Sequence, residues 1–328
     1  MAKMTMVQAL NLALLQEMER DDRVMVLGED VGVDGGVFRV TQGLIEKFGP
    51  ERVMDTPLAE SAIAGVSVGM ALYGLRPVCE MQFSGFSYLA FHQMESHAAR
   101  LRARSAGRFH VPMVLRAPYG GGVRALEHHS ESREVYWAHT PGLKTVIPSS
   151  PRNARALLVS AIRDPDPVVF YEPKALYRAF REEVPEEEET MPIGRSRVAR
   201  EGKDITLISY GASLHWTLEA ASLLKEKDGI DAEVIDLLTV SPLDDKLFTK
   251  SVRKTGRAVV IHEAPRSFGP GAEVTARLVE KSFLYLEAPI RRVTGFDIVI
   301  PLFQREQDYL PGVGRIVRAV HETLNFVG

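Results

Sequence analysis

A glutamate at the start of an apolar segment is the first side chain that could do chemistry. Glu60 directly precedes a run of Ala, Gly, Val, Ser and Ile that extends to Tyr73, so its carboxyl should lie near a helix N-terminus with hydrophobic neighbours. Burial raises a carboxyl pKa by up to about 3–5 units, while the helix dipole opposes that rise. A carboxyl held in this balance can exchange a proton with a heterocycle. A structural acid at a helix start is the simpler interpretation of this residue alone.

Two adjacent histidines follow a glycine-rich stretch and form the second candidate. His128 and His129 come shortly after the run at 120–122. Histidine titrates near neutral pH and is suited to proton transfer. The glycines could let the backbone approach a ligand closely, or they could form a flexible turn. Adjacent side chains point in different directions, so the pair predicts no metal site, and two loop histidines without a special role remain an alternative.

Strand ends should bring these groups together. Apolar runs at 24–27, 52–55, 77–81 and 112–116 read as buried strands, and polar or aromatic residues follow each of them. In open α/β sheets, ligands bind beyond the carboxyl ends of the strands. We therefore expect the acids and histidines to gather at one edge of a sheet.

The alternation of short strands and helices predicts an α/β fold with two parallel-sheet domains. We expect domains at residues 1–180 and 197–328, joined by an acidic, solvated linker at 181–196. Thr5 and Gln8 predict a capping box at the start of the first helix. The segment 60–73 is apolar on nearly every face and predicts a buried helix. Its small residues also lead us to expect packing across a subunit interface.

Composition excludes several classes of function. The net charge of −3 provides no basic field for nucleic acid or anionic lipid. No uncharged apolar stretch reaches about 20 residues, and no signal peptide is evident, so neither a membrane span nor secretion is expected. The single cysteine, Cys79, cannot form an internal disulfide, which favours a reducing compartment such as the cytoplasm.

Common cofactor and nucleophile motifs are missing from the sequence. It contains no dinucleotide-binding G-x-G-x-x-G after a strand, no phosphate-binding P-loop, no G-x-S-x-G nucleophile elbow and no zinc-type Cys/His spacing. The chain thus has acids and a histidine at strand ends but no phosphate cradle. This combination indicates an incomplete active site.

An ordered set of short motifs resembles one known family. The set includes Leu27-Gly-Glu-Asp-Val31, Asp55-Thr-Pro-Leu-Ala-Glu60, Glu80-Met-Gln-Phe83, His129-Ser130 and Tyr171-Glu-Pro-Lys174. Together they resemble the beta subunit of the decarboxylating component of 2-oxo acid dehydrogenase complexes, with branched-chain and bacterial forms nearest. The resemblance covers nearly the whole chain.

The resemblance implies a thiamine-diphosphate pyrimidine-binding domain followed by a transketolase C-terminal domain. It also implies an alpha subunit in an alpha-two-beta-two heterotetramer. That alpha chain would supply the Gly-Asp-Gly motif that holds magnesium and the diphosphate. A lipoyl acyltransferase core would accept the acyl group made from the 2-oxo acid substrate.

The resemblance also assigns roles to single residues. Glu60 would hydrogen-bond the pyrimidine ring nitrogen and favour the imino tautomer. His129, identified by the Ser130 beside it, would act in proton transfer during acylation of the lipoyl group. The other implied pyrimidine-pocket positions are Glu29, Leu58, Ala59, Gln82 and Phe86, and the substrate side would be lined by Phe86, Ser87, Tyr88, Leu89 and His129.

The resemblance further implies a monovalent-cation site, with potassium as the candidate ion. Its ligands would be the backbone carbonyls of Ala161, Asp164 and Asp166. The segment from Ser84 to Tyr88 and His92 depart from the branched-chain pattern beside the substrate, which leaves the acyl-chain preference open.

Other functions use the same fold. A split transketolase subunit would move ketol units with the same cofactor and would not need the lipoyl-acylating histidine. A nucleotide-binding electron-transfer subunit should copurify with flavin or nicotinamide. A purely structural subunit would leave its complex fully active after Glu60→Gln.

Overall fold

The computed structural model describes residues 1–327, which divide into two compact units. The first unit comprises Met1–Tyr119 and Tyr136–Ile193, and the second comprises Gly120–Val135 and the chain from Gly194 onward. The loop that carries the two histidines therefore belongs to the second unit, although it lies between two strands of the first in sequence. Each unit is described by itself below.

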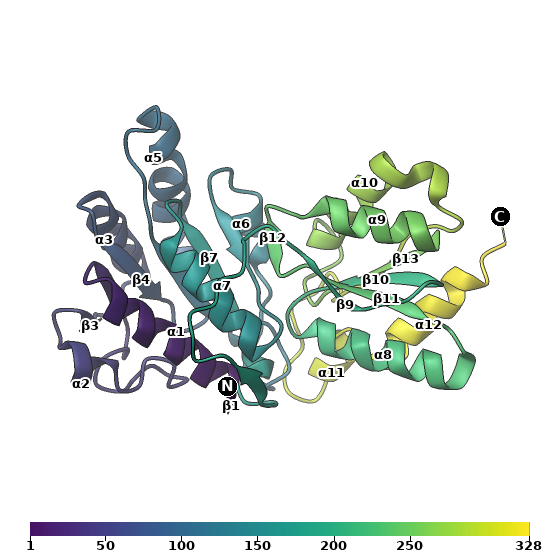
Figure 1. Ribbon diagram of the computed structural model, residues 1–328, viewed down its shortest axis with the longest axis horizontal. Helices are drawn as coiled ribbons and strands as arrows, with labels where there is room; N and C mark the ends of the chain where they lie inside the picture. Colours follow the sequence, from purple (N-terminus) through teal and green to yellow (C-terminus); the bar gives the residue numbers. More distant parts are fainter. Residues whose placement is uncertain (328) are drawn as a thin grey trace. The chain divides into compact units, whose positions relative to one another are not determined.

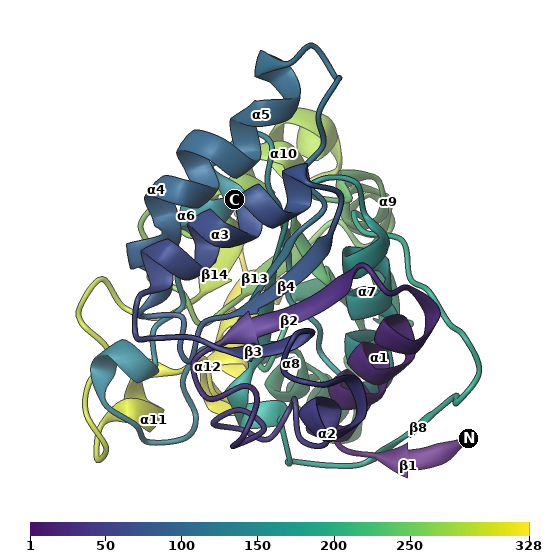
Figure 2. The same ribbon diagram turned by 90° about the vertical axis from the view of Figure 1, so that its left-hand side faces the viewer.

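The first unit is built around a parallel sheet whose strands follow the order β6-β7-β5-β4-β2-β3. Helices cover both faces, as the alternating sequence pattern predicts: α1 and α7 lie on one side and α3 with α5 on the other (Figure 2). The strands are β2 (Val24–Gly28), β3 (Val53–Asp55), β4 (Arg76–Glu80), β5 (Val114–Tyr119), β6 (Lys144–Val146) and β7 (Val168–Pro173).

Local sequence signals explain where the helices of this unit begin. Thr5 and Gln8 form the predicted capping box of α1. Ser150 forms a capping box with Asn153 at the start of α7, and Pro151 is the first residue of that helix. The region 87–104 is a series of short helical pieces, including a π-helical stretch. The helices are α1 (Met6–Arg20), α2 (Leu44–Phe48), α3 (Glu60–Leu72), η1 (Ser87–Ala90), α4 (Phe91–Gln93), η2 (Met94–Ala98), α5 (Ala99–Arg104), α7 (Pro151–Arg163) and η4 (Lys174–Leu176), with α6 (Glu134–Ala138) at the unit boundary.

Helix α3 departs from the expected burial. Val66 is 56% exposed and the adjoining Tyr73 is 93% exposed, so this apolar helix is not buried on every face within the chain. Its inner face is buried through Ile63, Ala64 and Val68. The prediction of a fully buried helix was therefore wrong. A helix that is apolar on every side gives no signal for which of its sides packs against the same chain.

The acidic segment is held against the first unit and is not simply a solvated linker. Strand β8 (Glu182–Val184) pairs antiparallel with β1 (Ala2–Met4). Glu189 pairs with Arg152 at 2.6 Å, and Glu188 pairs with Arg163 at 2.5 Å. Both arginines lie on α7, so this run neutralises basic side chains of that helix.

The second unit contains a mixed sheet of order β14-β13-β10-β11-β9, in which only β9 is antiparallel. Helices α9 and α10 cover one face, and α8 and α12 the other (Figure 1). Leu207, Val234, Val259 and Ile316 are among the fully buried core residues between the sheet and α8 and α12. The elements are η3 (Glu127–His129), β9 (Arg197–Arg200), β10 (Ile205–Ser209), α8 (Ser213–Asp228), β11 (Ala232–Asp236), β12 (Thr239–Ser241), α9 (Asp245–Thr255), β13 (Ala258–Ile261), α10 (Pro270–Ser282), η5 (Phe283–Tyr285), β14 (Arg291–Val293), α11 (Glu306–Tyr309) and α12 (Val313–Leu324).

Within residues 1–327, no helix combines the length and apolarity needed to cross a membrane.

Candidate functional site

The carboxyl ends of β2, β3 and β4 meet at one edge of the first unit. Gly28 at the end of β2 pairs in register with Asp55 of β3 and with Glu80 of β4. The residues that follow these strands therefore leave the sheet at the same level. This register brings Glu29, Gln82 and the segment leading to Glu60 to one edge, as the sequence predicts.

Glu29 is the most unusual side chain at this edge. It is only 3% exposed, and neither carboxyl oxygen has a hydrogen-bond partner among the described residues. Burial, followed by the charges of Glu60 and Asp30, raises the pKa of Glu29 to about 7. A buried carboxyl without partners is costly, and such groups usually have a functional explanation. Glu29 is therefore available to a ligand with hydrogen-bond donors.

Glu60 is the first residue of α3 and is 8% exposed. Ala59 occupies the N-cap position, and its side chain makes no capping hydrogen bond to the start of the helix. The contribution of Glu60 to the raised pKa of Glu29 shows that the two carboxyls interact electrostatically. The structure thus brings together two acids that are 31 positions apart in sequence.

The other predicted pocket residues differ in their surroundings. Gln82 donates from Nε2 to Asp30 Oδ2 at 2.7 Å. Phe86 lies edge-to-face with Phe83, with ring centroids 6.0 Å apart. Leu58 is 81% exposed and presents an apolar side chain outside the core.

Within the predicted substrate segment, the described structure separates a buried position from two exposed ones. Ser87 is buried, and its hydroxyl donates to the Ser84 carbonyl at 2.6 Å. Tyr88 and Leu89 are each 52% exposed. These two residues offer the most side-chain surface of the segment to a molecule outside the chain, and Phe86 is partly exposed.

A buried ionic network lies behind the same edge. Arg116 donates from Nε to Glu172 Oε1 at 2.8 Å, and its Nη1 also contacts Glu80. Burial, partly offset by the Arg116 charge, raises the pKa of Glu80. Tyr177 completes the network by donating to Glu172 at 2.5 Å. The sequence shows none of these pairings, because the partners lie on different strands.

His129 lies in the second unit, in the η3 turn of the loop 120–135. Its ring centroid is 4.1 Å from that of His128. Glu60 and Phe86 belong to the first unit, so the predicted catalytic residues come from both units of the chain.

Two buried glutamates fasten the backbone of this histidine loop. Glu263, which follows β13, accepts from the Gly121 N–H at 2.9 Å. Glu306, the first residue of α11, accepts from the N–H groups of Gly122 at 3.0 Å and Arg124 at 2.9 Å. Their exposures are only 3% and 1%. We call these two residues the glutamate clamp.

Glycine is required where the clamp approaches the loop. Gly120 has a φ of +80°, and a Cβ there would lie 2.7 Å from Glu263 Oε2. Sequence reasoning found the glycine run but missed both glutamates. The position of Glu263 at a strand end was a usable signal, whereas Glu306 lay beyond every predicted element.

A small cavity of about 200 Å³ adjoins the clamp within the second unit. Ser130, Arg133, Glu263 and Tyr309 are among the residues that line it. Nearby, Glu134 accepts from the Tyr210 hydroxyl at 2.6 Å, and burial raises the pKa of Glu134 to about 7. The histidine loop is therefore bordered by buried acids.

The proposed cation ligands lie at the end of α7 and just beyond it. The Ala161 carbonyl accepts from the Asp164 N–H at 3.3 Å. The Asp164 carbonyl accepts from Arg76 Nη1 at 3.3 Å. The side chain of Asp166 pairs with Arg102 at 2.7 Å. Among residues 1–327, no group of three or more His, Cys, Asp or Glu side chains is arranged to hold a metal ion.

Comparisons with known proteins identify two domain families along the chain. The transketolase pyrimidine-binding domain family matches residues 2–179, and the transketolase C-terminal domain family matches residues 194–316. A solved structure described as a split gene transketolase, inactive beta4 tetramer, superposes with a TM-score of 0.80 at 23% identity, covering 98% of this chain and 99% of that one. This last likeness concerns the fold.

Sequence relatives are considerably closer. The pyruvate dehydrogenase E1 component subunit beta of Acholeplasma laidlawii is 50% identical over 322 residues, covering 98% of each chain. The protein of the same name from Bacillus subtilis (strain 168) is 51% identical over 326 residues, covering 99% of this chain and all of the relative. The chain belongs to the family of pyruvate dehydrogenase E1 component beta subunits.

Proposed function

We propose that this chain is the beta subunit of a thiamine-diphosphate-dependent pyruvate dehydrogenase that passes the acyl group to a lipoyl acyltransferase. The observation that carries the proposal is the acidic pair at the sheet edge, in which Glu29 lacks partners and interacts with Glu60. Pyruvate is the substrate suggested by the named relatives. Branched-chain 2-oxo acids are the alternative, because the ordered motifs also resemble branched-chain forms, although the segment at 84–88 departs from their pattern.

The residues at this edge suit the pyrimidine half of the cofactor. Glu60 would accept a hydrogen bond from the protonated ring nitrogen, and Glu29 offers unpartnered oxygens to neighbouring donors. Leu58, Ala59, Gln82 and Phe86 would complete the pocket, with Phe86 against the ring. When bound, thiamine diphosphate supplies the electron sink that decarboxylation of a 2-oxo acid requires.

The proposed site needs a second polypeptide. This sequence carries no Gly-Asp-Gly motif, so we assign magnesium and the diphosphate to an alpha subunit, in an alpha-two-beta-two assembly. Potassium at the carbonyls of Ala161, Asp164 and Asp166 is a further part of the proposal. We place the complex in the cytoplasm, in keeping with a free, buried Cys79.

His129 is proposed to act after decarboxylation, when the acyl group moves to the lipoyl dithiolane. An imidazole can give or take a proton at that stage, which contributes about 10²–10⁴ in rate. Phe86, Ser87, Tyr88 and Leu89 were predicted to line the substrate side. The exposed Tyr88 and Leu89 are the members of that segment best able to contact an incoming group.

The test is reconstitution with the alpha partner and a comparison of two reactions. Pyruvate-dependent reduction of an artificial electron acceptor reports decarboxylation, and acylation of a lipoylated domain reports the full sequence. Glu60→Gln should lower both rates by about 10²-fold or more, because it removes the carboxyl that handles the proton. His129→Ala should lower only the lipoyl reaction. A fully active Glu60→Gln complex with intact assembly would rule out the proposed role.

A further inference from the structure

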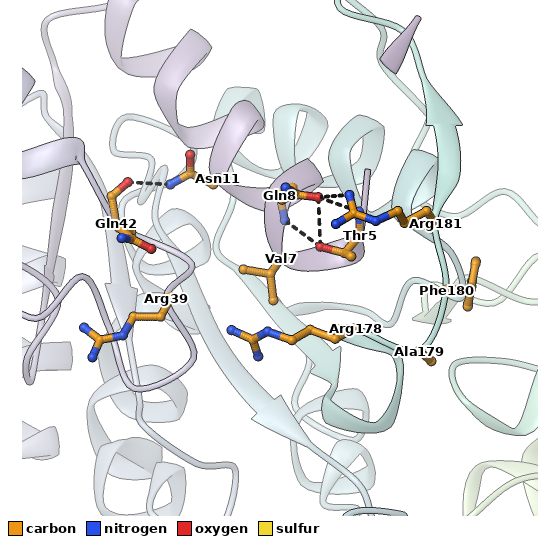
Figure 3. A pocket seen from close by; sticks show the side chains of 10 residues that line it. All are labelled: Thr5, Val7, Gln8, Asn11, Arg39, Gln42, Arg178, Ala179, Phe180 and Arg181. Atoms are coloured by element: carbon orange, nitrogen blue, oxygen red, sulfur yellow. Dashed lines mark hydrogen bonds between the residues drawn. The ribbon is translucent and has the colours of Figure 1, made fainter. Parts of the chain in front are cut away.

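A cavity of about 710 Å³ lies in the first unit, where three segments of the chain meet. Its walls come from the N-terminal end of α1, the turn at 39–42 and the stretch 178–181 (Figure 3). The volume lies within the range of about 300–1,000 Å³ that small-molecule sites occupy. None of the residues assigned to the pyrimidine pocket lines this cavity.

Three arginines and no acidic residue line the cavity. Arg39, Arg178 and Arg181 enter it from two segments (Figure 3). This concentration of positive charge contrasts with the net charge of −3 for the whole chain. The side chains of Gln8 and Asn11 add neutral polar groups to the wall.

Each of these arginines contacts only neutral oxygens among the described residues. Arg178 donates to the Phe38 carbonyl at 2.9 Å, and Arg181 donates to Gln8 Oε1 at 2.8 Å. Arg39 contacts the Asp34 carbonyl. Arg181 also donates to the Lys3 carbonyl at 3.3 Å. A guanidinium has several N–H donors in a planar fork, so these contacts leave donors available on each arginine. The charges themselves are not matched by any carboxylate of residues 1–327.

The turn that presents Arg39 is strained but firmly held. Arg39 has a φ of +67°, which is unfavourable for a residue with a side chain. The Asn11 side chain donates to the carbonyls of Val40 at 2.7 Å and Gln42 at 3.0 Å, and the Thr41 hydroxyl donates to Val31 at 2.7 Å. Backbone strain that is retained by surrounding bonds is concentrated at functional sites.

The N-terminal end of helix α1 adds to the positive potential of the cavity. Helix α1 is 15 residues long and has no acidic residue in its first turn. No carboxylate of that turn therefore offsets the N-terminal dipole of the helix. The helix dipole and the three guanidinium groups both make the potential in the cavity more positive.

We propose that this cavity binds a multiply charged phosphate anion, of the class of an organic diphosphate or triphosphate. Guanidinium forks match the geometry of phosphate oxygens, and charge-assisted bonds to them are stronger than neutral ones. Three unmatched cations require more than one negative charge on the ligand. This inference goes beyond the proposed function, since it concerns a second ligand.

The experiment is a calorimetric titration of the full chain with inorganic triphosphate at constant ionic strength, with inorganic sulfate for comparison. We expect one triphosphate per chain and weaker binding of sulfate. Arg178→Gln should weaken triphosphate binding about tenfold or more, because it removes a charge-assisted contact. Arg178→Lys should retain much of the affinity. Arg39→Gln should act like Arg178→Gln.

Arg104→Gln is the matched control, because Arg104 is also an exposed arginine of the first unit that donates to a carbonyl, that of Ser96. It should leave binding unchanged. Equal losses in Arg104→Gln and Arg178→Gln, or no saturable binding to the unmodified chain, would overturn the proposal.

The titration is then repeated on the assembled complex saturated with thiamine diphosphate and magnesium. Triphosphate should still bind at one site per beta chain without displacing the cofactor. Two results would contradict a separate anion site: competition with thiamine diphosphate, or loss of triphosphate binding on assembly together with weaker assembly of Arg178→Gln. Loss of triphosphate binding on assembly, together with weaker assembly of Arg178→Gln, would show that the arginines pair with acidic side chains of the alpha subunit.

Discussion

At the scale of single residues, the site depends on a carboxyl kept in an unfavourable state. Glu29 is buried without partners, and its pKa is raised to about 7 by burial and by Glu60 and Asp30. Sequence reasoning could place Glu29 and Glu60 at the same sheet edge, because both follow strands. It could not predict the missing partners, which depend on every side chain that packs around them.

The raised pKa of Glu29 makes a prediction about stability. The carboxyl has a pKa near 4.5 when unfolded and about 7 when folded, so the folded state binds more protons between these values. The contribution of Glu29 is therefore fully present below about pH 4.5 and is lost as the pH rises through 7. As the pH rises from 5 to 8, the unmodified chain should lose roughly 2 kcal/mol in free energy of unfolding relative to Glu29→Gln, which has no carboxyl at this position.

Urea unfolding of the isolated chain at several pH values measures this difference. Glu46→Gln, at an exposed position on α2, is the control and should follow the unmodified chain. Parallel pH profiles for Glu29→Gln and the unmodified chain would show that Glu29 is not held in a raised-pKa state.

At the scale of elements, the histidine loop is held by groups from distant parts of the chain. The loop 120–135 carries His129, and the glutamate clamp on the segments after β13 and in α11 accepts three of its backbone N–H groups. The predicted central strands and main helices are confirmed, because each has its own periodicity. Sequence reasoning missed β1, β8 and β9, which pair at long range, and the C-terminal α12.

Weakening the glutamate clamp should slow lipoyl acylation more than decarboxylation. Glu306→Gln replaces an acceptor of two N–H bonds by a neutral amide, which should let the loop move and misplace His129. Under the proposed function, we expect lipoyl acylation to fall about tenfold or more while acceptor-linked decarboxylation changes little. Asp308→Asn, on the same helix but with a 67% exposed side chain, is the control. Equal loss in both assays would show a general structural effect.

Helix α3 makes a prediction about assembly. Its outer apolar surface includes Val66 and adjoins Tyr73, and a Cβ at Gly69 would meet nothing within 4 Å in this chain. Gly69→Leu should therefore fold normally but disrupt assembly with the alpha subunit if the helix packs across an interface. Light scattering after size exclusion would measure the assembly, and far-ultraviolet circular dichroism would check the fold. A normal heterotetramer would contradict the interface role.

At the scale of the whole molecule, the proposed function makes this chain one side of a cofactor site. Under that proposal, Glu29 and Glu60 would serve the pyrimidine ring and His129 a later proton transfer, while the sequence lacks the Gly-Asp-Gly motif for magnesium and diphosphate. Family membership was predictable from the ordered motifs and is confirmed by relatives about half identical over the full chain. The substrate preference was not predictable, because the segment at 84–88 departs from the branched-chain pattern beside the substrate.

The most direct measurement compares pyruvate decarboxylation by three preparations: this chain alone, the alpha chain alone and the two combined. All three contain saturating thiamine diphosphate and magnesium, and released carbon dioxide is counted. We predict activity only in the combined preparation, since each chain would contribute essential groups. Full-rate decarboxylation by this chain alone would contradict the shared-site account.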